Sequence, residues 1–142
     1  MNGYRRILVP VDGSPTADRG LRKAIRLAKK HGAKLVLLHV VDERPAFLEF
    51  DSRVAASEFV RALVREGRNV LKRARTLAGR SGLSPRALLR ETFGEPAADE
   101  IVREAKRVRA DLIVMGTHGR SRNARRVLRS AGVPVLVVRR HS

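Results

Sequence analysis

The feature that most constrains the fold is a short apolar run that ends in two glycines. The run, Leu112 to Met115, contains no polar residue, which is typical of a strand buried on both faces of a parallel sheet. It breaks into Gly116-Thr117-His118-Gly119, and a helix-compatible segment follows from about Asn123. Glycines let the backbone approach a ligand, and a helix start offers unpaired N–H groups and the positive end of a dipole. The segment therefore predicts a strand, a turn suited to an anion, and a helix.

The remainder of the chain alternates between apolar runs and amphipathic segments. Ser14 followed by Pro15 is typical of a helix start, and Gly32 is typical of a helix end. The same reasoning predicts helices that begin at Pro15, at about Ser52, at about Pro96 and at about Asn123. The predicted strands are residues 6–11, 34–41, 86–92, 112–115 and 135–138.

Three local features add detail to this pattern. Gly67 lies on the apolar face of the long predicted helix, residues 52–81, where it either weakens the helix or allows close packing. Residues 42–51 are expected to form a loop. His39 lies within an apolar strand, and we expect it to be packed and hydrogen-bonded.

The alternation of strands and helices predicts an α/β fold, with a parallel sheet, helices on both faces and right-handed crossovers. In such sheets the ligand crevice lies outside the carboxyl ends of the strands, where the strand order reverses. If the first and fourth strands are neighbours there, Pro10-Val11-Asp12 faces Gly116-Thr117-His118-Gly119 across the crevice. The length suits a single domain, residues 1–142.

The net charge of +17, from 31 Lys and Arg against 14 Asp and Glu, is the most unusual bulk property. Such a charge attracts nucleic acid, anionic lipid or phosphorylated ligands. The basic residues are spread over all the predicted helices, which favours a solvated basic surface over a specific nucleic-acid site. Nucleic-acid binding is therefore expected to be nonspecific and confined to low salt.

Other classes of function are disfavoured by what the sequence lacks. No apolar run approaches the roughly 18 residues of a membrane span, and the N-terminus has no signal-peptide core, so we expect no membrane partner and a cytoplasmic location. The absence of cysteine excludes disulfides and thiol catalysis. Neither a metal-spaced cluster nor a Gly-x-Ser-x-Gly elbow is present, so the chain is not expected to be an enzyme.

Five segments, in order, resemble the universal stress protein family, and the likeness covers nearly the whole chain. The resemblance implies a five-stranded parallel α/β fold of the adenine nucleotide alpha hydrolase or Rossmann-like kind, with strand order 3-2-1-4-5, and usually a homodimer. Some members of the family bind ATP and others do not. The segments are Ile7–Ser14, Leu37–Val41, Gly94–Pro96, Asp111–Ser121 and Val133–Val138.

The phosphate loop departs from that of ATP-binding members, which reads Gly, two residues, Gly, nine residues, then Gly followed by Ser or Thr. Gly116 and Gly119 match its first half, but Arg129 stands where the third glycine is expected, with Ser130 after it. Aligned from the last strand instead, the chain lacks the Gly-Ser altogether, deleted after Ser121. On either alignment the second half of the loop is damaged. The missing Gly-Ser would supply backbone N–H and hydroxyl donors to phosphate.

The resemblance nevertheless carries nucleotide contacts onto this chain. The predicted binding residues are Pro10, Val11, Asp12, Val40, Met115, Gly116, Thr117, His118, Gly119, Arg120, Ser121 and Arg122. Several have a plainer alternative: Asp12 holds a ribose or amide edge or ends a turn, His118 touches phosphate or is exposed, and the hydroxyls bond phosphate or satisfy the turn. The arginines near Arg125 clamp phosphate, contact nucleic acid or are simply solvated.

ATP, accompanied by Mg²⁺, is the expected ligand and is expected to bind weakly. The alternatives are a dimeric regulatory scaffold that binds no nucleotide, and a basic protein that binds nucleic acid nonspecifically. No catalytic residue and no protein metal ligand is predicted, and slow ATP hydrolysis is the most catalysis expected. The last strand is apolar on both faces and is expected at a sheet edge, so we expect a homodimer in which it pairs with its copy, through Val135, Leu136, Val137 and Val138.

Overall fold

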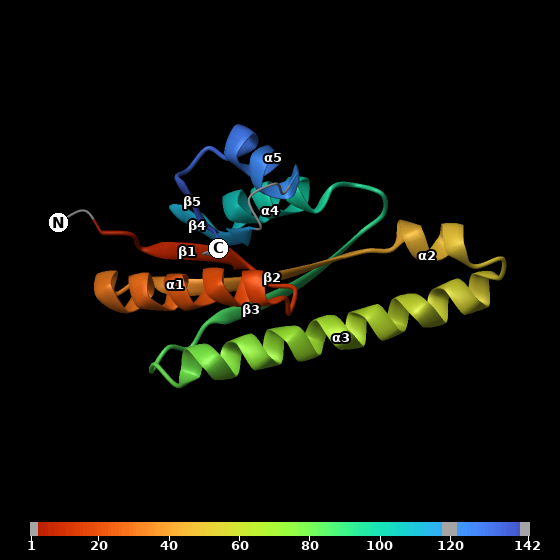
Figure 1. The fold of residues 1–142 in the computed structure, drawn as a ribbon, viewed down its shortest axis with the longest axis horizontal. Helices are drawn as coiled ribbons and strands as arrows, with labels where there is room; N and C mark the ends of the chain where they lie inside the picture. Colours follow the sequence, from red (N-terminus) through yellow and green to blue (C-terminus); the bar gives the residue numbers. More distant parts are fainter. Residues whose placement is uncertain (1–2, 118–121, 140–142) are drawn as a thin grey trace.

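The computed structural model describes residues 3–117 and 122–139. Within these ranges five parallel strands form one sheet in the order β3-β2-β1-β4-β5, which confirms the predicted fold class and strand order. The chain leaves the first strand toward one edge of the sheet and returns to the other side of it, so β1 and β4 are neighbours (Figure 1). The strands are β1 (Arg6–Pro10), β2 (Lys34–Asp42), β3 (Arg86–Thr92), β4 (Leu112–Thr117) and β5 (Val135–Arg139).

Helices cover both faces of the sheet. On one side lie α1 (Pro15–His31) and α3 (Arg53–Gly79), and on the other lie α4 (Ala97–Arg107) and α5 (Arg122–Ser130) (Figure 1). Successive strand residues point to opposite faces, so β1 contributes Ile7 and Val9 to the core under α1 and α3, and Leu8 to the core under α4 and α5. Each of these three side chains is fully buried, which stabilises the fold by roughly 1.5–3 kcal/mol per residue.

The first helix begins and ends where the sequence predicts. The Ser14 hydroxyl accepts a hydrogen bond from the Ala17 N–H at 3.1 Å, and Pro15 occupies the first turn. Gly32 ends the helix in the left-handed conformation, with φ of 66°, and its N–H bonds to the Ala28 carbonyl. The Ser14 cap fixes the start of α1 directly after β1, and Gly32 fixes its end.

Gly67 allows close packing, which settles the alternatives left open by the sequence. A Cβ at this position would lie 2.5 Å from Cδ2 of His39 and 3.0 Å from Cδ1 of Leu89. The glycine therefore lets α3 approach β2 and β3 without displacing the His39 ring.

The prediction of a loop over residues 42–51 is wrong, because a short helix, α2 (Arg44–Glu49), forms there. Asp42 Oδ1 accepts hydrogen bonds from the N–H groups of Arg44 at 3.1 Å and Gly94 at 2.8 Å, which fixes the turn into the helix. The Phe47 ring then packs on Phe93, with centroids 5.9 Å apart. A helix of six residues has too few turns to show a periodic pattern, and Phe93, the aromatic partner of Phe47, is distant in sequence.

Figure 1 shows α2 and the beginning of α3 extending beyond the sheet. None of the helices in the described ranges is both long and apolar enough to cross a membrane.

Candidate functional site

A cavity of about 240 Å³ opens at the carboxyl ends of β1 and β4. These strands pair directly, with Ile7 beside Leu112 and Leu8 beside Ile113, so the segments that follow them meet at one edge of the sheet. This is the place where ligands bind in open α/β sheets. The lining residues are Pro10, Val11, Asp12, Ser14, Thr16, Ala17, Leu38, His39, Val40, Ala97, Ile101, Met115, Gly116, Thr117 and Asn123.

Most of the predicted site residues with a described position line this cavity. They are Pro10, Val11, Asp12, Val40, Met115, Gly116 and Thr117. Arg122 lies exposed at the first position of α5, next to the lining residue Asn123. The predictions for His118, Gly119, Arg120 and Ser121 fall outside the described residues.

Sequence reasoning missed the lining residues that come from helix starts and from β2. Ser14, Thr16 and Ala17 belong to the first turn of α1, whereas Ala97 and Ile101 belong to α4. A signal for them existed, because in a parallel sheet every helix that follows a strand begins at the carboxyl edge. The predicted topology was therefore enough to include the first turn of each helix.

Asp12 supports the turn at the end of β1. Its Oδ1 accepts a hydrogen bond from the Ser14 N–H at 2.9 Å, and the Ser14 hydroxyl in turn caps α1. Asp12 is exposed on the cavity wall, and a carboxylate has several acceptor positions, so bracing the turn leaves capacity for a ligand donor. Of the two alternatives for Asp12, a ligand contact or the end of a turn, the structure therefore shows the second.

Gly116 is required by the packing of α1 on β4. A Cβ at Gly116 would lie 1.9 Å from the carbonyl oxygen of Thr16, and a Cβ at Gly20 would lie 2.6 Å from the Gly116 nitrogen. These two glycines bring the helix and strand backbones into direct contact. The sequence argument assigned Gly116 to ligand approach alone, and it missed this contact because α1 and β4 are far apart in the chain.

His39 links the second strand to the site, as predicted for a packed, hydrogen-bonded histidine. Its Nδ1 lies 2.8 Å from the Val11 carbonyl oxygen. If Nδ1 carries the proton, it donates to that carbonyl and Nε2 is left as an acceptor in the neutral ring. The bond holds the backbone of Val11, a cavity residue, against β2.

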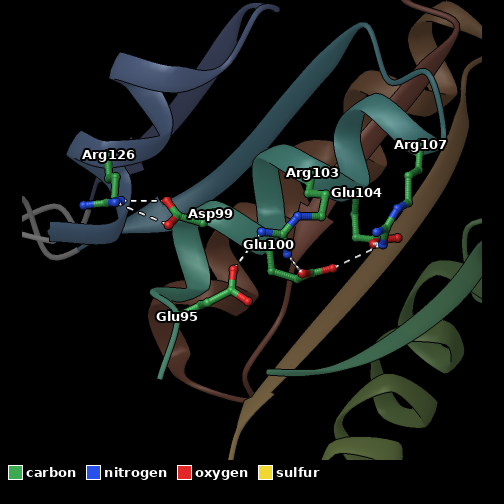
Figure 2. Close-up of polar contacts among 7 residues, drawn as sticks. All are labelled: Glu95, Asp99, Glu100, Arg103, Glu104, Arg107 and Arg126. Atoms are coloured by element: carbon green, nitrogen blue, oxygen red, sulfur yellow. Dashed lines mark hydrogen bonds and ion pairs between the residues drawn. The ribbon is translucent and has the colours of Figure 1, made fainter. Parts of the chain in front are cut away.

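An ion pair joins the two helices beside the cavity. Arg126 of α5 contacts Asp99 of α4 through two nitrogens, with Nε to Oδ1 at 2.7 Å and Nη2 to Oδ2 at 3.3 Å (Figure 2). The hydrogen bond from Arg126 lowers the pKa of Asp99 below its ordinary value. Arg126, one of the arginines considered for phosphate binding, is therefore engaged in holding α5 against α4.

A buried carboxyl pair lies on the other side of α4. Glu100 and Glu104 are 4% and 0% exposed and form ion pairs with Arg103 and Arg107 (Figure 2). Arg90 also contacts Glu104. Burial, followed by the hydrogen bond with Glu104, raises the pKa of Glu100. Burial alone would also raise the pKa of Glu104, but the bond with Glu100 and the guanidinium groups of Arg90 and Arg107 lower it.

The arginines around this pair come from two elements. Arg90 belongs to β3, and its Nε lies 3.2 Å from Glu104 Oε1, while Arg103 and Arg107 belong to α4 itself. Arg103 also reaches Glu95 Oε2 at 2.7 Å. The network fixes α4 on β3 and so positions Ile101, which lines the cavity.

The sequence and fold match one protein family. The model of the Universal stress protein family matches residues 3–139. A universal stress protein of Methanocaldococcus jannaschii, MJ0531, is 34% identical over 147 aligned positions, covering 98% of this chain and 84% of that protein. A solved structure from the same family, of Burkholderia pseudomallei, is 38% identical with a TM-score of 0.78, over 96% of this chain and 97% of its own. The universal stress protein of Archaeoglobus fulgidus in complex with dAMP is 26% identical with a TM-score of 0.75, over 96% of this chain and 98% of its own.

Proposed function

Because the chain belongs to the universal stress protein family, we propose that it is a regulatory binding protein whose crevice holds an adenine nucleotide. The observation that carries the proposal is the cavity at the ends of β1 and β4, lined by seven of the residues predicted to bind nucleotide. The relative from Archaeoglobus fulgidus, solved in complex with dAMP, supports the choice of ligand class.

The cavity suits the nucleoside part of the ligand. Its volume of about 240 Å³ is below the roughly 300–1,000 Å³ typical of pockets that enclose a whole small molecule. Val40, Ala97 and Ile101 offer an apolar wall for a base, and Asp12 offers acceptors to a ribose hydroxyl or an adenine amino group. The phosphates then lie toward Gly116 and the first turn of α5.

The triphosphate is the part that we expect to be held least well. In this chain the Gly-Ser of the phosphate loop is lost. Among the described residues in the first turn of α5, the exposed Arg122 and Arg125 take part in none of the ion pairs. Asp12 is the one carboxylate among the described residues that line the crevice, so the phosphates would supply most of the ligands to an accompanying Mg²⁺.

The proposal extends to assembly, activity and location. We propose a homodimer formed through β5, an edge strand whose valines and leucine are only half-buried within one subunit. The protein would act by binding, with slow ATP hydrolysis as its only catalysis, in the cytoplasm.

Calorimetry with AMP, ADP, ATP and cyclic AMP tests the nucleotide proposal directly. The sharpest variant is Asp12→Asn, because the amide oxygen can still accept from the Ser14 N–H while the charge and its further acceptors are lost. We expect AMP to bind roughly tenfold more weakly, as for loss of one charge-assisted hydrogen bond. Asp51→Asn, at an exposed position away from the cavity, serves as the control.

Two results would contradict the proposal. The first is that none of the four nucleotides binds to the wild-type protein at millimolar concentration. The second is that Asp12→Asn and Asp51→Asn bind AMP equally well, which would place the nucleotide elsewhere on the molecule.

A further inference from the structure

A second hollow lies at the opposite end of the sheet, among the amino ends of the strands. It has a volume of about 730 Å³ and lies between the first residues of β2 and β3, the turn over residues 82–84 and the end of α4. Among the described residues that line it there are five cations and no carboxylate. The cations are Arg6, Lys34, Arg86, Arg107 and Arg109.

Two of these cations already have partners within the fold. Arg6 Nη1 donates to the Val108 carbonyl at 2.7 Å, and Arg107 is paired with Glu100 and Glu104. The other three, Lys34, Arg86 and Arg109, are exposed and take part in none of the ion pairs between described residues. Three positive charges therefore face one hollow without compensation.

Helix dipoles do not account for these three residues. Cations stabilise the last turn of a helix, and in α4 this role belongs to Lys106 and Arg107. Lys34 and Arg86 are the first residues of strands, and Arg109 lies beyond the end of α4.

Arg109 also adopts an unfavourable backbone conformation. Its φ is 57°, in the left-handed region that disfavours residues with a side chain. The position thus keeps an arginine where glycine or asparagine would be more stable, and this is consistent with a role for its charge.

We propose that this hollow, the amino-end basic cavity, binds a small ligand with two or more linked phosphates. Linked phosphates supply several negative charges within a few ångströms, which matches three converging cations, and arginine can bind phosphate oxygens through two parallel hydrogen bonds. The volume is within the range of small-molecule pockets. A concave hollow suits a compact ligand better than a nucleic-acid duplex, which requires an extended basic stripe.

The test is calorimetric titration with inorganic tripolyphosphate at near-physiological salt. The site variant carries Lys34→Gln, Arg86→Gln and Arg109→Asn, where asparagine tolerates the left-handed backbone. The control variant loses the same three charges from exposed positions on α1 and α3, with the changes Arg22→Gln, Arg26→Gln and Arg65→Gln.

We expect the site variant to bind tripolyphosphate on the order of 100-fold more weakly, because it loses three charge-assisted contacts. The control variant should change less than threefold. Equal weakening in both variants would overturn the proposal, since it would mean that the overall charge of +17 attracts the anion without a site. If the triple variant does not fold, Arg86→Gln against Arg22→Gln makes the same comparison, with about a tenfold loss expected for Arg86→Gln alone.

Further titrations identify the source of the phosphates. In the first titration, AMP saturates the crevice and ADP is then added. If the natural ligand of the amino-end basic cavity is a nucleotide, ADP should show a second binding event in the wild-type protein and none in the site variant. Binding of tripolyphosphate alone would instead indicate a free polyphosphate. A short DNA duplex that binds while tripolyphosphate neither binds nor competes would overturn the proposal of a compact ligand.

Discussion

Gly116 shows how a single residue can combine a ligand-site position with a packing requirement. Its missing side chain leaves space for the carbonyl of Thr16, which would lie 1.9 Å from a Cβ. Substitution by valine, which would be expected to block a nucleotide, would therefore first disturb the contact of α1 with β4. Loss of binding in such a variant could not be assigned to the ligand contact.

We predict that Gly116→Ala destabilises the protein by about 3 kcal/mol in the absence of any nucleotide, because backbone atoms on both sides must shift. Chemical denaturation measures this loss. Gly132→Ala is the matched control, since no atom lies within 4 Å of a Cβ at that position, and its free energy of unfolding should be nearly unchanged. Equal stability of the two variants would show that α1 can move away from β4 at little cost.

At the scale of elements, α4 illustrates what could and could not be predicted from the sequence. Its apolar periodicity correctly indicated a helix with Ile101 and Ala105 turned inward. Burial of Glu100 and Glu104 was missed, since two acidic residues one turn apart are typical of a solvated face. Their burial depends on Arg90, a partner on β3 that no local pattern reveals.

In the rest of the fold, too, local features could be predicted from the sequence and long-range contacts could not. Strands and helix caps were predictable, because apolar runs and Ser14-Pro15 are local signals, and the α/β alternation indicated a parallel sheet. The strand order was implied by the resemblance to the family. The cavity residues at the ends of strands followed from that topology. The short α2 and the Gly20–Gly116 contact were not predictable, because each depends on residues that meet only in the folded chain.

The carboxyl pair of α4 predicts opposite pH effects for its two members. The pKa of Glu100 is raised above 4.5 in the folded protein, so its contribution to stability is complete below pH 4.5 and is lost as the pH rises through the folded value. The pKa of Glu104 is lowered from 4.5, so its contribution is present above pH 4.5 and is lost as the pH falls through the folded value.

Glu100→Gln should therefore remove a decline in stability above pH 4.5 and cost little at neutral pH. Glu104→Gln should cost about 2 kcal/mol at neutral pH, because the partly exposed guanidinium groups of Arg90 and Arg107 lose their charge-assisted contacts with a buried carboxylate. Denaturation midpoints between pH 4 and 8 measure both effects, with the exposed Glu58→Gln as control. If the two buried variants show the same pH profile, the pKa values of the two carboxyls are not shifted in opposite directions.

The edge strand β5 carries the prediction about assembly. Leu136 and Val138 pack on one core and Val135 on the other, so Val137 is the position where a change should disturb the subunit least. We predict that Val137→Lys shifts a dimer to monomer in sedimentation at micromolar concentration, because it places charge in the paired strands. Val54→Lys, at a residue 68% exposed on α3, should leave the assembly unchanged. A wild-type protein that is already monomeric would contradict the proposed dimer.

On the scale of the whole molecule, the charge is distributed unevenly between the two ends of the sheet. The crevice at the carboxyl end includes Asp12, whereas the cavity at the amino end is lined by cations without a carboxylate among the described residues. The net charge of +17 adds a general attraction for anions that salt screens over about 8 Å at physiological ionic strength. A specific nucleotide site must therefore be distinguished from this background by its dependence on salt and on single residues.

We predict that ATP binds weakly in the crevice and that AMP is nearly as good a ligand. The lost Gly-Ser would have supplied two or three hydrogen bonds to phosphate, each worth roughly 1.5–3 kcal/mol with a charged acceptor, so its absence weakens ATP by several powers of ten. AMP should depend less on those donors, because it carries one phosphate instead of three. Calorimetry with both nucleotides at low and physiological salt should show ATP binding falling more steeply than AMP binding.

The last prediction tests whether the exposed arginines of α5 replace some of the phosphate contacts that the lost Gly-Ser would have made. Arg122→Glu with Arg125→Glu should weaken ATP at least tenfold more than AMP, because both residues lie in the first turn of α5, where we expect the phosphates to bind. The matched control, Arg22→Glu with Arg26→Glu on α1, changes the net charge equally and should weaken both nucleotides alike. Submicromolar ATP affinity that survives high salt and the α5 changes would show that the remaining backbone turn binds the triphosphate without the Gly-Ser. The arginines would then be only part of the solvated surface.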